Sequence, residues 1–174
     1  MGKGTVLRRL LELRPDLAES VSCTTRDPRP GEVDGRDYLF VSNHLFDQLI
    51  EDGAFLEWAN VYGHRSGTLL GPIADAVESG RTIVLEIDVQ GAAQVRERVP
   101  GATLIFLTPP SEEELARRLR DRGTETDADL RHRLDAADDE MRMALWFDHV
   151  VVNDDVDRAA REVAAIIHEE RAAG

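Results

Sequence analysis

Three short apolar segments, rich in β-branched residues, constrain the fold of this chain most strongly. They are residues 82–88 (Thr-Ile-Val-Leu-Glu-Ile-Asp), 103–107 and 150–152, and each is followed by residues at helical spacing. Such continuous runs are typical of strands that are covered on both faces, as in a parallel sheet. Because these predicted buried strands alternate with helices, we expect an α/β domain in which helices flank a parallel sheet in three layers.

Helix caps and chain-breaking residues predict the remaining elements. In the first part of the chain these are a helix over 6–13 that stops near Pro15, a strand over 38–42, a helix capped by Ser42 and ended by Gly53, an extended segment over 54–62, a glycine-punctuated loop over 63–72 and a short helix to about Glu78. In the second part they are a helix that begins with a Ser111–Glu114 capping box and reaches about Arg122, a helix over 127–145 and a last helix capped by Asp155.

Composition excludes several classes of function. The chain has 174 residues, which is the length of one domain, and a net charge of −13, which makes a nucleic-acid backbone a poor partner. No apolar run is long enough to span a bilayer, and the sequence shows no signal-peptide pattern. Cys23 is the only cysteine, which fits a reducing compartment, so we expect a cytoplasmic protein with Cys23 as a packed bystander.

Residues 20–38 combine a short strand with a loop rich in proline, glycine and arginine. Two guanidinium groups, at Arg26 and Arg29, lie three residues apart, with hydroxyl groups at Ser22 and Tyr38 on either side. These groups suit a small dianion such as a phosphate monoester. The alternative is a solvated turn in which the arginines pair with nearby carboxylates, namely Asp27 and Asp34.

Residues 2–5, Gly-Lys-Gly-Thr, match the end of a phosphate-binding loop that opens a helix. Backbone N–H groups would cradle the phosphates, and Lys3, the only lysine of the chain, would reach the terminal ones. The first glycine of the motif and the strand before it are missing. Gly4 stands where a magnesium-binding hydroxyl is usual, so Thr5 or water must serve.

Together these segments resemble the guanylate kinase family, and the resemblance covers nearly the whole chain. Residues 22–38 are similar to the GMP-binding segment of that family, 85–91 to its acidic strand end, 122–124 to its lid and 152–155 to its last strand-to-helix turn. The resemblance implies a fold like that of P-loop NTPases, with a core of about 1–21, 73–110 and 146–174, a GMP-binding part of about 22–72 and a helical lid of about 111–145.

The resemblance also implies a set of GMP-binding residues. The phosphate would be held by Arg26, Arg29 and Tyr38. On the guanine base, Glu57 would accept hydrogen bonds from N1–H and N2, and O6 would accept from Ser22 and Thr68. Asp88 would contact the nucleotide, and Glu86 lies close by in the sequence. The alternative for Glu57 is an exposed carboxylate on a strand. Family members usually have an aromatic residue where this chain has Ser66, so one phosphate contact is shortened or lost, and we expect Arg65 to compensate.

On the donor side the resemblance implies an ATP site and a closing lid. The ATP site comprises Gly2, Lys3, Gly4, Thr5 and Asn153, and the catalytic cations are Lys3, Arg118, Arg122 and Arg133. Mg²⁺ would be held through phosphates and water, with Thr5 as a possible ligand. The alternative is that the lid arginines form i,i+4 ion pairs along their helices, and we interpret Arg131 and Arg142 as structural residues of this kind.

The implied function is that of a transferase, an ATP-dependent GMP kinase acting on GMP and dGMP with Mg²⁺ as cofactor. Two alternatives stay open, a non-catalytic guanylate-kinase-like interaction module and a truncated form with weak ATP binding. Because the strand that feeds a phosphate loop is central in such sheets, we also expect that Met1 is not the natural start of the chain.

Overall fold

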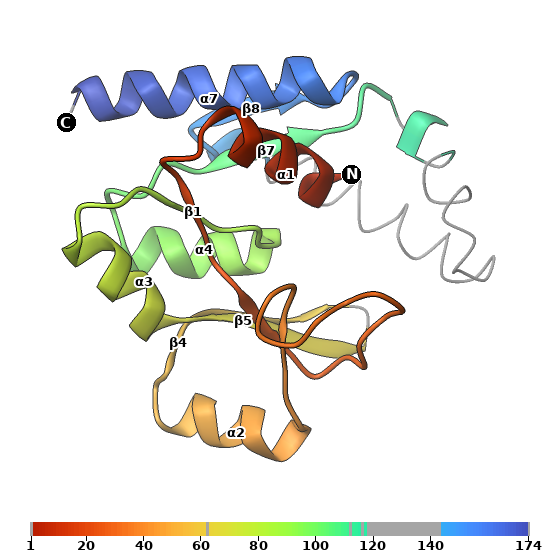
Figure 1. The fold of residues 1–174 in the computed structure, drawn as a ribbon, viewed down its shortest axis with the longest axis vertical. Helices are drawn as coiled ribbons and strands as arrows, with labels where there is room; N and C mark the ends of the chain where they lie inside the picture. Colours follow the sequence, from red (N-terminus) through yellow and green to blue (C-terminus); the bar gives the residue numbers. More distant parts are fainter. Residues whose placement is uncertain (1, 62, 112, 116, 118–143, 174) are drawn as a thin grey trace. The chain divides into compact units, whose positions relative to one another are not determined.

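The structure is a computed structural model, and it describes residues 2–61, 63–111, 113–115, 117 and 144–173 (Figure 1). The chain forms two compact units. The first unit comprises Met1–Arg14 and Thr103–Gly174, and the second comprises Pro15–Ala102. Both units contain parallel strand pairs and helices, so the predicted α/β class is confirmed.

The first unit places two helices beside a pair of parallel strands. Its elements are α1 (Lys3–Leu13), β7 (Ile105–Thr108), the 3-10 turn η1 (Ala144–Trp146), β8 (His149–Val152) and α7 (Val156–Ala173). Strands β7 and β8 pair in parallel, and α1 packs along α7 (Figure 1). The apolar stripe predicted for α1 is buried at Val6, Leu7 and Leu10. Asp155 caps α7 as predicted, because its Oδ1 accepts a hydrogen bond from the Arg158 N–H at 2.8 Å.

The prediction of a fully buried strand over 150–152 is wrong. Only Val151 is buried, whereas Val150 and Val152 are 49% and 39% exposed. Side chains alternate between the two faces of a strand, so a run of three valines is fully buried only where both faces are covered. Within the described residues, β8 pairs with β7 alone.

The second unit is built on a four-stranded sheet. Its elements are β1 (Ala18–Glu19), β2 (Ser22–Thr24), β3 (Leu39–Phe40), α2 (Asn43–Glu51), β4 (Phe55–Val61), β5 (His64–Leu69), α3 (Leu70–Glu78), β6 (Ile83–Val84) and α4 (Val89–Arg98). The strand order is β3-β2-β5-β4, where β2 and β3 run parallel and the other neighbours run antiparallel. A separate parallel pair joins β1 to β6.

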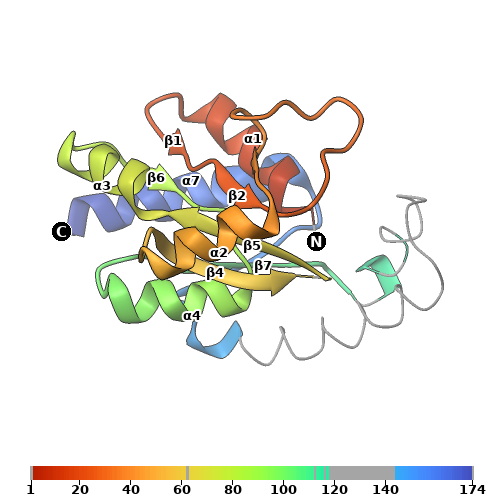
Figure 2. The same ribbon diagram turned by 90° about the horizontal axis from the view of Figure 1, so that it is seen from below.

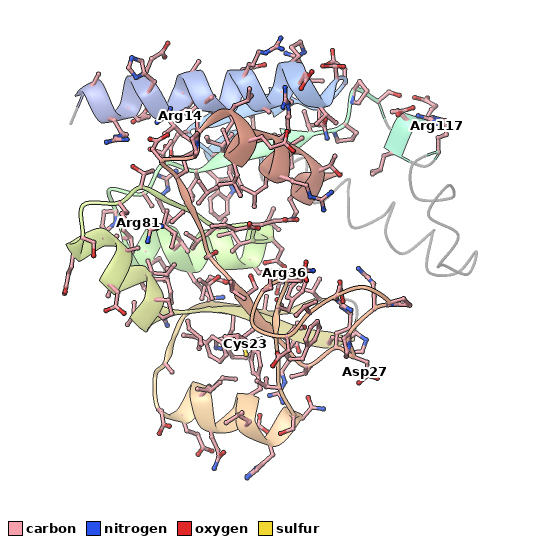
Figure 3. All side chains as sticks on the ribbon, in the orientation of Figure 1. Arg14, Cys23, Asp27, Arg36, Arg81 and Arg117 are labelled. Atoms are coloured by element: carbon pink, nitrogen blue, oxygen red, sulfur yellow. The ribbon has the colours of Figure 1, made fainter. Side chains whose placement is uncertain are left out.

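Helix α2 covers one face of this sheet. Cys23, Phe46 and Phe55 form the buried cluster between them. Figure 3 shows Cys23 on the side of the sheet that faces α2. The rings of Phe46 and Phe55 lie 4.5 Å apart. Ser42 caps α2 as predicted, because its Oγ accepts from the Leu45 N–H at 3.1 Å. Burial raises the pKa of the Cys23 thiol to about 11, which agrees with a packed and unreactive cysteine.

Two predictions for the second unit are wrong. Within the segment predicted as the loop 63–72, His64–Leu69 form β5, which pairs with both β2 and β4, and residues 70–72 already belong to α3. Gly67 lies within this strand, and the position requires glycine. A Cβ there would lie 2.7 Å from the Glu57 carbonyl oxygen and 2.8 Å from the Trp58 Cβ. The strand predicted over 82–88 shortens to the half-buried pair Ile83–Val84, because its partner β1 is only two residues long.

Candidate functional site

The second unit brings three of the predicted GMP-binding residues into one row across its sheet. Thr68 on β5 lies opposite Ser22 on β2 and opposite Glu57 on β4. Residues directly opposite one another in a sheet point to the same face. The next row, which includes Cys23 and Trp58, faces α2, so the row of Ser22, Thr68 and Glu57 lies on the face away from that helix.

Glu57 supplies the carboxylate of this row, and its burial is unusual for a carboxylate. Its side chain is only 3% exposed, so the alternative of an exposed strand carboxylate is wrong. Burial raises the pKa of Glu57, and the charge of Asp88 raises it further, whereas Thr68 lowers it. The neighbouring Thr68 is 1% exposed. Among the described residues, its hydroxyl oxygen has no hydrogen-bond partner. A buried acceptor and a buried hydroxyl without a partner are therefore adjacent, which is suited to a polar ligand.

Asp88 reaches the same place from the start of α4. Its Oδ1 accepts from the Gly91 N–H at 2.8 Å and caps the helix, and its Oδ2 accepts from Gln90 Nε2 at 3.1 Å. Gly91 lies directly against the Glu57 carboxylate, because a Cβ on Gly91 would stand 2.3 Å from Glu57 Oε2. The two carboxylates and the first turn of α4 thus form one cluster with Thr68.

Arg26 and Tyr38 lie together in the loop between β2 and β3. The Arg26 guanidinium stands 5.2 Å from the centre of the Tyr38 ring and binds both carboxylate oxygens of Glu32, at 2.9 and 3.0 Å. Hydrogen bonding to Arg26 lowers the pKa of Glu32, so this partner stays ionised. Burial raises the pKa of the Tyr38 phenol, and the nearby charge of Glu86 raises it too.

In the solvated-turn alternative, the arginines of this loop pair with Asp27 and Asp34, and these ion pairs are not found among the described residues. Asp34 accepts from the Phe40 N–H at 2.9 Å, and Asp27 offers Arg26 its backbone carbonyl, at 2.6 Å. The Arg29 side chain is exposed, and its backbone N–H donates to Glu32 at 2.6 Å. Glu32 therefore organises this loop, and sequence reasoning missed it because no motif distinguishes it from the other acidic residues nearby.

Arg65 does not take the place of the missing aromatic residue. Ser66 shares the face of Thr68, whereas Arg65, one position earlier on β5, points to the opposite face. There its guanidinium binds Asp47 and Asn43 of α2 and lies 4.8 Å from the centre of the Phe46 ring. The predicted compensation by Arg65 is wrong because strand alternation directs its side chain to α2.

The predicted ATP-site residues belong to the first unit. Gly2 precedes α1 in the left-handed conformation (φ 74°), and its carbonyl accepts from the Thr5 and Val6 N–H groups at 3.2 Å. Asn153, which is 1% exposed, follows β8 and lies against Gly2, since a Cβ on Gly2 would stand 3.1 Å from Asn153 Nδ2. The positive end of the α1 dipole and the Lys3 ammonium thus occur at the same helix start.

The start of the predicted lid lies within the described residues. Ser111 Oγ accepts from the Glu114 N–H at 3.2 Å, as expected of a helix start. Arg118, Arg122 and Arg133 lie outside the described residues, as do Arg131 and Arg142.

Neither a protein metal centre nor a membrane span is found in the part of the chain that the structure describes. No group of three or more His, Cys, Asp or Glu side chains is placed there to hold a metal ion. None of the described helices combines the length and the apolar character needed to cross a bilayer.

Comparison with known proteins gives one consistent match. The family model described as guanylate kinase matches residues 1–170. The guanylate kinase of Caldanaerobacter subterraneus subsp. tengcongensis is 46% identical over 170 residues, which cover 98% of this chain and 82% of that protein. The guanylate kinase of Cutibacterium acnes is 51% identical over 168 residues, which cover 96% of this chain and 84% of that protein. The crystal structure of guanylate kinase from Anaplasma phagocytophilum has a TM-score of 0.83 and 35% identity, and covers 96% of this chain and 81% of that one.

Proposed function

Because this chain belongs to the guanylate kinase family, we propose that it is a nucleoside monophosphate kinase that transfers the γ-phosphoryl group of ATP to GMP or dGMP. The family match covers nearly the whole chain and includes both the predicted ATP-binding and GMP-binding segments. The relatives described above are named as kinases, and nothing in them favours a non-catalytic interaction module.

The observation that carries the proposal is the row of Ser22, Thr68 and Glu57, in which Thr68 and Glu57 are buried. Guanine presents two adjacent donors, N1–H and the N2 amino group, and an ionised Glu57 accepts from both. The Thr68 hydroxyl, buried beside it, and the Ser22 hydroxyl donate to O6. Adenine has an acceptor at N1, so it would leave the buried carboxylate opposite a lone pair.

The phosphate of GMP would be bound in the β2–β3 loop. Arg26 uses two of its N–H groups on Glu32 and one on the Asp27 carbonyl, which leaves further donors for phosphate oxygens. Arg29 adds an exposed guanidinium and Tyr38 a protonated phenol. Asp88 and Glu86 carry the acidic side of the site, where Asp88 fixes the start of α4 beside the base.

ATP would be bound at the start of α1. Gly2 and Gly4 supply backbone N–H groups for phosphate, and Thr5 adds its side-chain hydroxyl, because its own N–H donates to the Gly2 carbonyl. Lys3 supplies a point charge, and Asn153 borders the adenine. The exposed Thr5 side chain fits a magnesium ion that is held mainly by phosphate oxygens and water, and the ion supplies charge neutralisation when bound. Arg118, Arg122 and Arg133 of the lid neutralise charge on the transferring group.

No covalent intermediate and no general base are needed. Phosphoryl transfer depends on alignment of donor and acceptor and on charge stabilisation, which the cations named above provide. The expected location is the cytoplasm, where a lone buried thiol such as Cys23 stays reduced.

The test is phosphoryl transfer from Mg-ATP, followed as GDP formation, with AMP as the competing acceptor. We expect kcat/KM for GMP to exceed that for AMP by about 10²-fold or more. Glu57→Gln should narrow this ratio, because its amide N–H₂ opposes one guanine donor. Equal rates with GMP and AMP would contradict the proposal. GMP binding in calorimetry without any turnover would favour the interaction module instead.

A further inference from the structure

Helix α4 binds the outer edge of β4. In the described part of the chain, β4 is the last strand of its sheet, so alternate N–H and C=O groups along that edge have no strand partner. Helix α4 runs alongside this edge (Figure 2). Three of its side chains, each four residues from the next and therefore on one face of the helix, bind the edge: Gln90, Gln94 and Arg98.

Two of these side chains hold the peptide groups on either side of Glu57. Arg98 Nη1 donates to the Leu56 carbonyl at 2.7 Å, and this carbonyl belongs to the peptide group before Glu57. Gln94 Oε1 accepts from the Trp58 N–H at 3.2 Å, and this N–H belongs to the peptide group after Glu57. Gln94 Nε2 also donates to the Trp58 carbonyl at 2.7 Å. The position of Glu57 along the strand is thus set by the helix as well as by β5.

Gln94 is suited to this contact in a way that few side chains are. A carboxamide presents a donor and an acceptor side by side, so it binds one residue at both N–H and C=O as a neighbouring strand would. The same helix also limits the carboxylate of Glu57 directly, through the close approach of Gly91. Backbone and carboxylate of Glu57 are therefore both placed by α4.

We infer that Gln94 is a positioning residue that sets the guanine selectivity of Glu57. The inference rests on the proposed function, in which Glu57 accepts from N1–H and N2 of guanine. A carboxylate must meet two donors at once to use both, so a small shift of the strand weakens the second hydrogen bond. In this scheme Gln94 acts on the substrate only through Glu57.

The experiment compares the affinities of the full chain for GMP and IMP by calorimetry. IMP has the N1–H donor but lacks the N2 amino group, so the ratio of the two affinities reports how well Glu57 meets N2. In Gln94→Met, which keeps the length of the side chain but removes both polar groups, we expect the ratio to fall about tenfold, with IMP affinity changed by less than about threefold. KM for GMP should rise while kcat stays within about twofold. Gln48→Met, at an exposed position of α2, is the matched control and should leave the ratio unchanged.

Each outcome discriminates. An equal fall in GMP and IMP affinity would reduce Gln94 to a structural role and overturn the inference, as would an unchanged ratio. A parent chain that does not prefer GMP to IMP would overturn the proposed reading of guanine as well, so the two failures differ. If Gln94→Met does not fold, Gln94→Glu keeps the size and the acceptor for Trp58 N–H but loses the donor. The GMP preference should fall in this variant too, and an unchanged preference would overturn the inference.

Discussion

Replacing Gly91 with alanine should damage GMP recognition without damaging the fold. Gly91 lies within α4, its φ is not in the left-handed region, and alanine is the better helix former by about 0.5–1 kcal/mol. The added Cβ, however, would stand 2.3 Å from Glu57 Oε2 and 3.4 Å from Asp88 Oδ1. The first of these distances is about 1 Å shorter than an ordinary contact between carbon and oxygen.

The strain is relieved at the carboxylate rather than at the helix. Glu57 Oε2 is the end of a side chain, whereas Gly91 belongs to a helix whose cap and edge contacts hold it in place. The Glu57 carboxylate therefore moves by about 1 Å. A misplacement of that size at a recognition group costs about 10²-fold in rate. The gain in helix propensity offsets part of the strain, so the melting temperature should change by no more than about 4 °C.

Steady-state kinetics with GMP and thermal unfolding of the same samples test this prediction. Gly71→Ala is a matched control, since Gly71 also lies in a helix and a Cβ there meets nothing within 4 Å. The control should keep the parent kcat/KM. A Gly91→Ala variant with kcat/KM within twofold of the parent would refute the proposal that the Glu57 carboxylate, held beside α4, reads guanine.

Three further perturbations address other parts of the site. Burial raises the pKa of Glu57 above its ordinary value of 4.5, so this side chain contributes to stability below pH 4.5, and the contribution is lost as pH rises through the raised pKa. The stability of Glu57→Gln relative to the parent should therefore increase with pH, as measured by thermal unfolding from pH 5 to 8. GMP affinity of the parent should rise over the same range, because in the proposed site guanine binds the ionised form of the Glu57 carboxylate. Glu32→Gln should lower GMP affinity by about tenfold but leave guanosine affinity unchanged, because Arg26 loses its two-point partner; an increase in calorimetry would mean that Glu32 competes with phosphate. Arg133→Ala should lower kcat by about 10²-fold with little change in GMP affinity, and loss of GMP binding with kcat retained would place Arg133 at the acceptor.

Local signals predicted the parts of the fold that depend on neighbouring residues. Ser42 and Asp155 cap their helices as expected, because a cap depends on a side chain and an N–H only three residues away. The apolar spacing of α1 is buried where predicted. Strand β5 was missed because its glycine reads as a break in the sequence, while in the sheet Gly67 allows the close approach of Trp58.

For the candidate site, residue types were predictable and their partners were not. Glu57 and Thr68 were named from a resemblance, and the structure places them opposite each other on adjacent strands. The partners that hold the site come from distant positions, as Gln94 does 36 residues after Trp58. Such pairs depend on tertiary packing, and no spacing rule along the chain identifies them. Glu32 was missed for a related reason, since its role follows from the loop conformation.

The single cysteine gives this chain an internal reporter of local opening. Cys23 is fully buried in the core of the second unit, and a thiol with a pKa of about 11 is almost entirely protonated near neutral pH. Alkylating reagents attack the thiolate, so modification in the native protein requires that this unit first opens. When the unit recloses faster than the reagent reacts, the rate constant of labelling is the equilibrium constant for opening multiplied by the alkylation rate constant of the exposed thiol. A ligand bound to the second unit at 100 times its Kd should then slow labelling by about 100-fold. Alkylation followed by mass spectrometry would thus test whether GMP binds the second unit, without any donor nucleotide or turnover.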